Sequence, residues 1–226
     1  TSPPEIYTLS LHDALPISAY KPRTSPYAFQ GLGKRGLEIL AQVSAATGLP
    51  VITEVLDPRS IDLVAEYAAV IQIGSQNIQN YDLLREAGKQ KKPILLKRGI
   101  MSTLSEFLLA AEYILSQGNS SVILCDCGIR TFEQVTRSAL DVSAIPFLKQ
   151  ETHLPVVVDP SQAAGNSFFV AALAMAAVAA GADGVCLDVH PDPESAMVHG
   201  NQSILPAQFA ELAGRLAGIH AIVAGA

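Results

Sequence analysis

The sequence Pro93-Ile94-Leu95-Leu96-Lys97 runs into Thr103-Leu104-Ser105-Glu106 and, further on, into Val122-Ile123-Leu124-Cys125. The first and last of these segments are short apolar runs without polar alternation, typical of strands in a parallel sheet that is covered on both faces. The middle segment is a capping box, and apolar residues at helical spacing follow it as far as Gly118-Asn119. Residues 93–125 therefore predict a strand, a helix and a second strand.

The same alternation continues on both sides of this unit. Further strands are expected at residues 50–54, 70–74, 155–159 and 184–188, and further helices at residues 36–48, 58–68, 82–89, 167–180 and 206–216. A TIM barrel and a doubly wound open sheet both satisfy this order. The one Gly-x-Gly-x-x-Gly match, at residues 31–36, is preceded by no predicted strand. The absence of this turn after a strand weakens the dinucleotide-binding form of the open sheet and favours the barrel. A barrel has eight strands, and six complete ones are predicted.

Composition excludes several classes of protein. The chain has 226 residues, with 15 Lys and Arg against 21 Asp and Glu, and a net charge of -6. We therefore expect no nucleic-acid partner. The longest apolar run, Phe168–Ala180, is too short to span a membrane. Three cysteines do not make a disulfide framework in a chain of this size, so reduced thiols and a cytoplasmic protein are expected.

Polar side chains follow most of the predicted strands, at the edge where barrel active sites are built. They are Glu54, Gln72 with Ser75-Gln76-Asn77, Lys97-Arg98, Asp126, Asp159 with Ser161-Gln162, and Asp188 with His190. For any single position the alternative is that a strand ends where solvent begins. Lys97-Arg98 is the stronger signal, because a charge on an inward-facing strand end needs a partner, and an anionic substrate would supply one.

Two further patterns bear on chemistry. Residues 21–26, Lys-Pro-Arg-Thr-Ser-Pro, combine two cations, two hydroxyls and two stiff prolines, which suits a phosphate ester, although a solvated basic loop is the alternative. Cys125 and Cys127 share one face of a strand, and their spacing fits neither a redox motif nor a usual zinc site. We predict buried thiols there.

Several motifs together resemble the type I DAHP synthases, which are related to the octulosonate-phosphate synthases. The motifs are Ala19-Tyr20-Lys21-Pro22-Arg23-Thr24-Ser25-Pro26-Tyr27 with Phe29-Gln30-Gly31, Leu95-Leu96-Lys97-Arg98-Gly99, Gly128-Ile129-Arg130-Thr131-Phe132-Glu133, Val158-Asp159-Pro160-Ser161 and Val189-His190-Pro191-Asp192-Pro193. The resemblance implies an aldolase-type (β/α)8 TIM barrel over residues 19–226 that lacks the first strand and part of the second. Residues 1–18 resemble the translated read-through of a sequencing adaptor and are predicted to be non-native.

The resemblance also implies a reaction. These enzymes condense phosphoenolpyruvate with erythrose 4-phosphate at the first step of aromatic amino acid (shikimate) biosynthesis, release phosphate, use a divalent metal that polarises the aldehyde, and form dimers or tetramers. By position, Lys97 would bind phosphoenolpyruvate and is the candidate proton-transfer group. The substrate-binding set would comprise Lys21, Arg23, Thr24, Ser25, Gln76, Arg98, Cys127, Arg130 and Ser161.

Several of these positions depart from the family pattern. Gln76 and Cys127 stand where the family has phosphate-binding arginines, and each change removes a bidentate cationic group. The metal-binding positions are altered as well: Gln162 replaces a His, Asp188 replaces a Glu and His199 replaces an Asp. The fourth ligand, a Cys at the end of the first strand, falls outside the sequence. Asp and His are legitimate ligands, whereas Gln is a poor one.

These departures leave three hypotheses open. The first is an active DAHP synthase with a shifted site, in which Asp188, His190 or His199 holds the metal and Arg130 replaces a lost guanidinium. The second is a catalytically impaired paralogue with a binding or regulatory role. The third is a related condensing enzyme that uses another aldehyde.

Overall fold

The computed structural model of the chain describes Ala19, Tyr27 and residues 30–196 and 198–225. Residues 1–18 and the motif at residues 20–26 lie outside the described residues. The expectations for the adaptor-like segment and for Lys21, Arg23, Thr24 and Ser25 therefore stay predictions.

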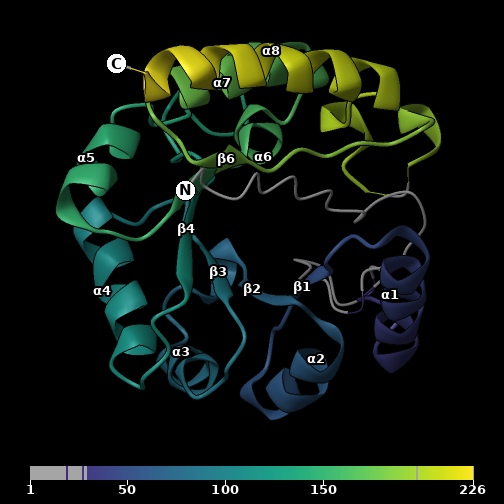
Figure 1. The fold of residues 1–226 in the computed structure, drawn as a ribbon, viewed down its shortest axis with the longest axis vertical. Helices are drawn as coiled ribbons and strands as arrows, with labels where there is room; N and C mark the ends of the chain where they lie inside the picture. Colours follow the sequence, from purple (N-terminus) through teal and green to yellow (C-terminus); the bar gives the residue numbers. More distant parts are fainter. Residues whose placement is uncertain (1–18, 20–26, 28–29, 197, 226) are drawn as a thin grey trace.

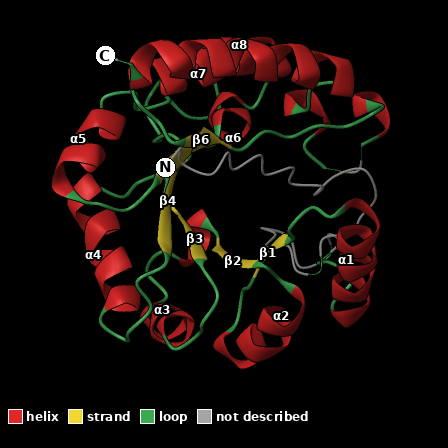
Figure 2. Cartoon of the chain, in the orientation of Figure 1, coloured by secondary structure: helices red, strands yellow, loops and turns green. Residues whose placement is uncertain are grey.

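Six parallel strands form one curved sheet in chain order (Figures 1 and 2). They are β1 (Ile52–Glu54), β2 (Val70–Ile73), β3 (Ile94–Lys97), β4 (Val122–Asp126), β5 (Val156–Val158) and β6 (Gly184–Val185). Each strand pairs with the next, for example Ile52 with Val70 and Lys97 with Cys125. All six predicted strands are confirmed. The last is shorter than expected, and an isolated bridge between Val189 and Ile204 continues its direction.

Helices line the outer side of the curved sheet (Figure 2). The α-helices are α1 (Lys34–Thr47), α2 (Ile61–Tyr67), α3 (Tyr81–Gly88), α4 (Leu104–Leu115), α5 (Ala144–Glu151), α6 (Pro160–Ala164), α7 (Ser167–Ala179) and α8 (Pro206–Ala224), and the short 3-10 helices are η1 (Pro58–Ser60), η2 (Ser75–Asn77), η3 (Pro193–Ser195) and η4 (Gly200–Gln202). The predicted capping box is present: the Glu106 backbone N–H donates to Thr103 Oγ1 at 3.2 Å, and the Thr103 backbone N–H donates to Glu106 Oε2 at 2.8 Å. The predictions missed α5 and α6, and α8 extends beyond the expected residue 216.

The sheet separates two apolar layers. Because successive strand residues point to opposite faces, one alternate set faces the helices and the other faces the interior of the curve. The helix-facing strand residues belong to the main core and include Ile71, Ile73, Ile94, Leu96, Val122, Leu124, Val156 and Val158. The interior cluster contains Leu95, Cys125, Cys127 and Val157, with Ile52, Val70, Ile123 and Cys186 packed against it. Burial on both faces explains why the strands read as continuous apolar runs.

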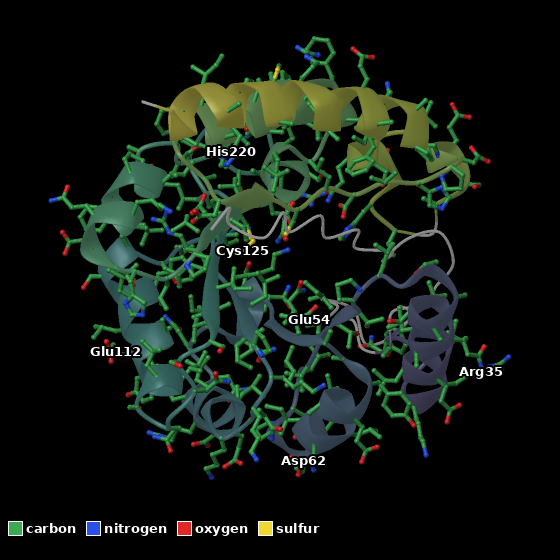
Figure 3. All side chains as sticks on the ribbon, in the orientation of Figure 1. Arg35, Glu54, Asp62, Glu112, Cys125 and His220 are labelled. Carbon is green, nitrogen blue, oxygen red and sulfur yellow. The ribbon has the colours of Figure 1, made fainter. Side chains whose placement is uncertain are left out.

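Figure 3 shows the same division for labelled side chains. Glu54 and Cys125 lie on the inner side of the curved sheet, whereas Arg35, Asp62 and Glu112 lie on the outer surface. None of the helices in the described part of the chain combines the length and the apolar character that a membrane crossing requires. The inner side at the carboxyl ends of the strands is therefore the place to look for chemistry.

Candidate active site

Lys97 is the centre of the inner site. It is the last residue of β3 and shares the inner face with Leu95. Its Nζ donates to Asp159 Oδ2 at 2.6 Å and to Gln162 Oε1 at 3.0 Å, and both ion-pair partners are buried. Burial alone would lower the pKa of Lys97, but the Asp159 carboxylate outweighs it and holds the pKa well above its usual value. The side chain is therefore an ammonium at neutral pH.

Asp159 and Gln162 are positioned by the start of α6. The Gln162 backbone N–H donates to Asp159 Oδ1 at 2.8 Å, so Asp159 caps the helix, and Pro160 follows at its first position. One carboxylate oxygen thus holds the helix while the other accepts from Lys97. The short segment Asp159-Pro160-Ser161-Gln162 in this way places both acceptors of the ammonium.

Asp188 follows β6 and is held by several neighbours. Gln202 Nε2 donates to Asp188 Oδ2, and His199 Nδ1 lies 3.4 Å from the same oxygen. The Asp188 backbone N–H donates to Ser161 Oγ at 3.0 Å, which ties this position to α6. Burial raises the pKa of the Asp188 carboxyl, but His199, Gln202 and the charge of Lys97 together lower it to about 2.

His199 has a backbone conformation that few side chains adopt. With φ 60 and ψ 12 it lies in the left-handed region, the single non-glycine residue with positive φ in the described part of the chain. Such a conformation costs about 1 kcal/mol or more and persists where surrounding contacts impose it. Here the turn into η4 brings His199 and Gln202 to the same carboxylate.

Arg98 does not share the site of Lys97. Its Nη1 donates to Asp126 Oδ1 and to Asp141 Oδ2, each at 3.0 Å, and its Nε donates to the Ser102 carbonyl at 3.1 Å. Consecutive strand residues point to opposite faces, so Arg98 and Asp126 follow the helix-facing set. The expectation that Arg98 faces inward and needs a substrate anion is therefore wrong, because protein carboxylates balance its charge. The substrate-binding role that the resemblance implies for Arg98 stays a prediction.

The three cysteines lie next to one another and close enough to Lys97 to act on its charge. Cys125 and Cys127 are fully buried, Cys186 is half-buried, and all three are free thiols. Hydrogen bonds with Cys127 and Cys186, together with burial, raise the pKa of the Cys125 thiol well above its usual value. The predicted buried thiols are thus confirmed for Cys125 and Cys127.

The remaining predicted residues are dispersed. Gln76 in η2 and Arg130 are exposed, whereas Ser161 is fully buried and accepts from the Asp188 backbone. His190 is buried, and its Nδ1 accepts from the Asp192 backbone at 3.0 Å. Sequence reasoning missed Gln202 as a site residue. It lies 14 residues after Asp188 in the chain, and nothing in its local sequence indicates their contact.

Glu54 marks the other end of the inner site. It ends β1, is buried, and lies so close to Gly74 that a Cβ on that glycine would stand 2.0 Å from Glu54 Oε1. Only a residue without a side chain permits this approach. Glycine at the end of β2 therefore makes room for the carboxylate.

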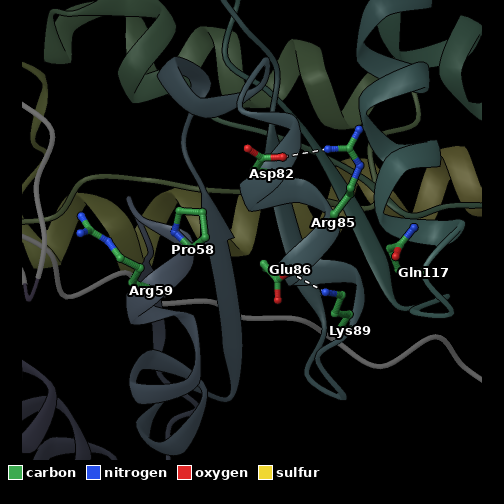
Figure 4. A pocket seen from close by; sticks show the side chains of 7 residues that line it. All are labelled: Pro58, Arg59, Asp82, Arg85, Glu86, Lys89 and Gln117. Carbon is green, nitrogen blue, oxygen red and sulfur yellow. Dashed lines mark hydrogen bonds and ion pairs between the residues drawn. The ribbon is translucent and has the colours of Figure 1, made fainter.

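A cavity of about 470 Å³ lies away from this site, between η1, α3 and the end of α4 (Figure 4). It is lined by Pro58, Arg59, Asp82, Arg85, Glu86, Lys89 and Gln117. Its cations are already paired locally: Arg59 with Asp57, Arg85 with Asp82 at 2.8 Å, and Lys89 with Glu86 at 2.5 Å. Because each of the three lining cations already has a carboxylate partner, the cavity presents no unpaired cation to a charged ligand.

Comparison with known proteins identifies the family of this chain. The profile of the DAHP synthetase I family matches residues 9–223. The chain belongs to the DAHP synthetase I family. It is 53% identical over 194 residues to phospho-2-dehydro-3-deoxyheptonate aldolase of Thermotoga maritima, and 32% identical over 215 residues to 2-dehydro-3-deoxyphosphooctonate aldolase of Syntrophotalea carbinolica. These matches cover 86% and 90% of the chain, and 57% and 76% of the two relatives.

Solved structures from this family also match the chain in fold. The crystal structure of the Thermotoga maritima DAHP synthase superposes with a TM-score of 0.87 at 50% identity, covering 90% of this chain and 60% of that one. A truncated form of the same enzyme gives 0.83 at 47% identity, covering 87% of this chain and 74% of that one. The curved sheet, with six strands in the described residues, thus corresponds to part of a truncated (β/α)8 TIM barrel, and the predicted fold class is confirmed. The chain spans 57% of the length of the Thermotoga relative.

The described residues of this family member do not fit a divalent metal. Of the three predicted ligands, Asp188 and His199 are adjacent, whereas Gln162 turns its oxygen to the Lys97 ammonium. Across the described ranges, no group of three or more His, Cys, Asp and Glu side chains is placed to hold a metal ion. A carboxamide has one weak oxygen ligand, and here that oxygen faces a cation.

Proposed function

We propose that the protein containing this chain condenses phosphoenolpyruvate with erythrose 4-phosphate, as the resemblance to DAHP synthases implies, in the cytoplasm and as a homo-oligomer. The observation that supports the proposal is the buried Lys97 ammonium on the inner face of the barrel, in a family member 53% identical to a phospho-2-dehydro-3-deoxyheptonate aldolase. The activity is proposed for the whole protein, since the chain spans little more than half of that relative.

The chemistry available to Lys97 follows from its hydrogen bonds. An ammonium has three N–H donors, and among the described residues Asp159 and Gln162 accept two of them. The third can donate to a carboxylate or a phosphate oxygen of phosphoenolpyruvate. The same group can donate a proton to the aldehyde oxygen while the enol carbon attacks the aldehyde carbon. Release of inorganic phosphate, with uptake of one water, completes the balance.

Asp159 and Gln162 act on Lys97 rather than on the substrate. Asp159 keeps the side chain protonated, and the cap of α6 fixes the direction from which both acceptors approach. A group held in this way loses little further freedom when a substrate binds. We assign Asp159 and Gln162 as positioning residues for Lys97.

A second function is supported by the altered residues. Gln76 and Cys127 replace two phosphate-binding arginines of the family, and Cys127 is fully buried among apolar side chains. These changes favour a binding or regulatory role without turnover, in association with an active synthase. A related condensing reaction with another aldehyde is the third candidate, since the phosphooctonate aldolases are also relatives.

Phosphate release from phosphoenolpyruvate in the presence of erythrose 4-phosphate tests the proposal. Lys97→Met should abolish release, whereas Lys149→Met, at an exposed surface pair, should leave it unchanged. Release that depends instead on a five-carbon aldose phosphate, the length that an eight-carbon phosphooctonate requires beside phosphoenolpyruvate, would favour the other aldehyde. Binding of phosphoenolpyruvate by calorimetry without any release would favour the binding role.

A further inference from the structure

The positive charge of the inner site comes from the protein itself. Lys97 Nζ contacts Asp159 at 2.6 Å and Gln162 at 3.0 Å, and its charge also acts on the carboxyl of Asp188. One ammonium thus acts on side chains from the start of α6 and from the segment that follows β6. Lys97 and Asp159 have side-chain exposures of 11% and 8%, so water screens their interaction poorly.

We infer that the Lys97 ammonium takes the place of a divalent cation in this site, and that the site binds its substrate anion without a metal. The inference rests on the proposed function for the identity of that anion. It concerns this chain's own donors and acceptors, and it gives Gln162 a role as an acceptor for Lys97 rather than as a metal ligand.

The state of each candidate ligand supports the inference. The single oxygen of the Gln162 carboxamide is directed at Lys97, which is the arrangement that a neutral acceptor and an ammonium prefer. Asp188 accepts from Gln202 and lies beside His199, so its charge is met by protein donors. Both acceptor groups are therefore already engaged by hydrogen-bond donors of the chain.

Repulsion between the Lys97 ammonium and a divalent ion also opposes metal binding at this site. A divalent ion that ligated Gln162 would have to approach within a few ångströms of the Lys97 nitrogen, or displace it from a buried carboxylate. In a site shielded from water, two like charges at such a distance repel strongly. A divalent ion on Gln162 and a Lys97 ammonium paired with Gln162 therefore exclude each other, and removal of the ammonium should admit the ion.

Titration with Mn²⁺, followed by the electron paramagnetic resonance signal of the free ion, tests the exclusion in the 226-residue chain. The unaltered chain and the surface control Lys149→Met should bind no Mn²⁺ below about 1 mM. Lys97→Met should bind it at least about tenfold more tightly, because this change leaves the buried Asp159 carboxylate without its cation. Mn²⁺ binding by the unaltered chain at micromolar concentration would overturn the inference. So would a folded Lys97→Met chain that gains no affinity.

If Lys97→Met does not fold, a second measurement tests whether the site binds its substrate anion without a metal. Calorimetric titration with phosphoenolpyruvate should give the same Kd in EDTA and in excess Mn²⁺, and a Kd that falls more than about threefold with Mn²⁺ would overturn the inference. Failure of the proposed function has a different signature. In that case phosphoenolpyruvate does not bind under either condition, while the Mn²⁺ titration still shows whether the ammonium excludes the metal.

Discussion

Replacement of Arg98 by methionine should cost much of the stability of the fold. Arg98 and Asp126 have side-chain exposures of 4% and 0%, and Asp141 is a second carboxylate partner at 3.0 Å. Removing one member of a buried pair leaves an uncompensated charge, which typically costs about 3–5 kcal/mol. In a domain of this size each kcal/mol lowers Tm by roughly 2–4 °C, so the expected loss is about 6–20 °C.

The dependence on pH of the stability loss in Arg98→Met tests the reasoning more sharply than the size of that loss. Burial raises the pKa of Asp126, and the Arg98 guanidinium and the Gly128 N–H only partly offset it. A carboxyl whose folded pKa is raised contributes stability below its unfolded pKa, near 3.9, and loses that contribution as pH rises through the folded value. Without Arg98 the folded pKa rises further. The deficit of Arg98→Met should therefore be largest near neutral pH and shrink towards pH 4.

Urea unfolding at pH 7 and at pH 4.5, followed by circular dichroism, measures both effects. Lys149→Met is the matched control, because Lys149 and Asp183 form a pair with side-chain exposures of 41% and 36%, and it should cost no more than about 1 kcal/mol. The double variant Arg98→Met with Asp126→Leu should recover much of the lost stability. A loss at Arg98 no larger than at Lys149, or a loss that does not change with pH, would refute the reasoning.

Three further outcomes are expected. Gly74→Ala places a Cβ 2.0 Å from Glu54 Oε1 and should lower the free energy of unfolding in urea by about 1–3 kcal/mol. Gly214→Ala in α8, with open space around it, should be neutral or stabilising, and equal effects of the two changes would contradict the close approach. The pKa of Asp188 is lowered to about 2, so its contribution to stability is present above the unfolded pKa near 3.9 and is lost as pH falls towards 2. Asp188→Asn should flatten the dependence of the unfolding free energy on pH in that range, and an unchanged dependence would argue against the contacts with His199 and Gln202. The thiols should react with Ellman's reagent far more slowly in the native chain than after denaturation, whereas rapid native reaction of Cys125 would contradict its burial.

Local sequence was sufficient for the elements and for their order. Apolar runs without alternation predicted six parallel strands, and the Thr103 capping box predicted the start of α4, because both depend on neighbours in the chain. Helix α5 was missed because it is short and carries a proline near its start. The polar strand ends indicated where the site lies, since carboxyl ends of parallel strands share one edge.

Tertiary structure decided which of those polar residues act together. Lys97 and Arg98 are adjacent in sequence, yet one faces Asp159 inside the curve and the other faces Asp126 among the helices, because the period of a strand is two and its faces differ. Gln162 reads as a lost metal ligand in the sequence, and only the fold shows that it accepts from Lys97 across 65 residues of chain. Sequence thus determined the scaffold and its family pattern, whereas pairing of buried charges depended on long-range distances that no local pattern encodes.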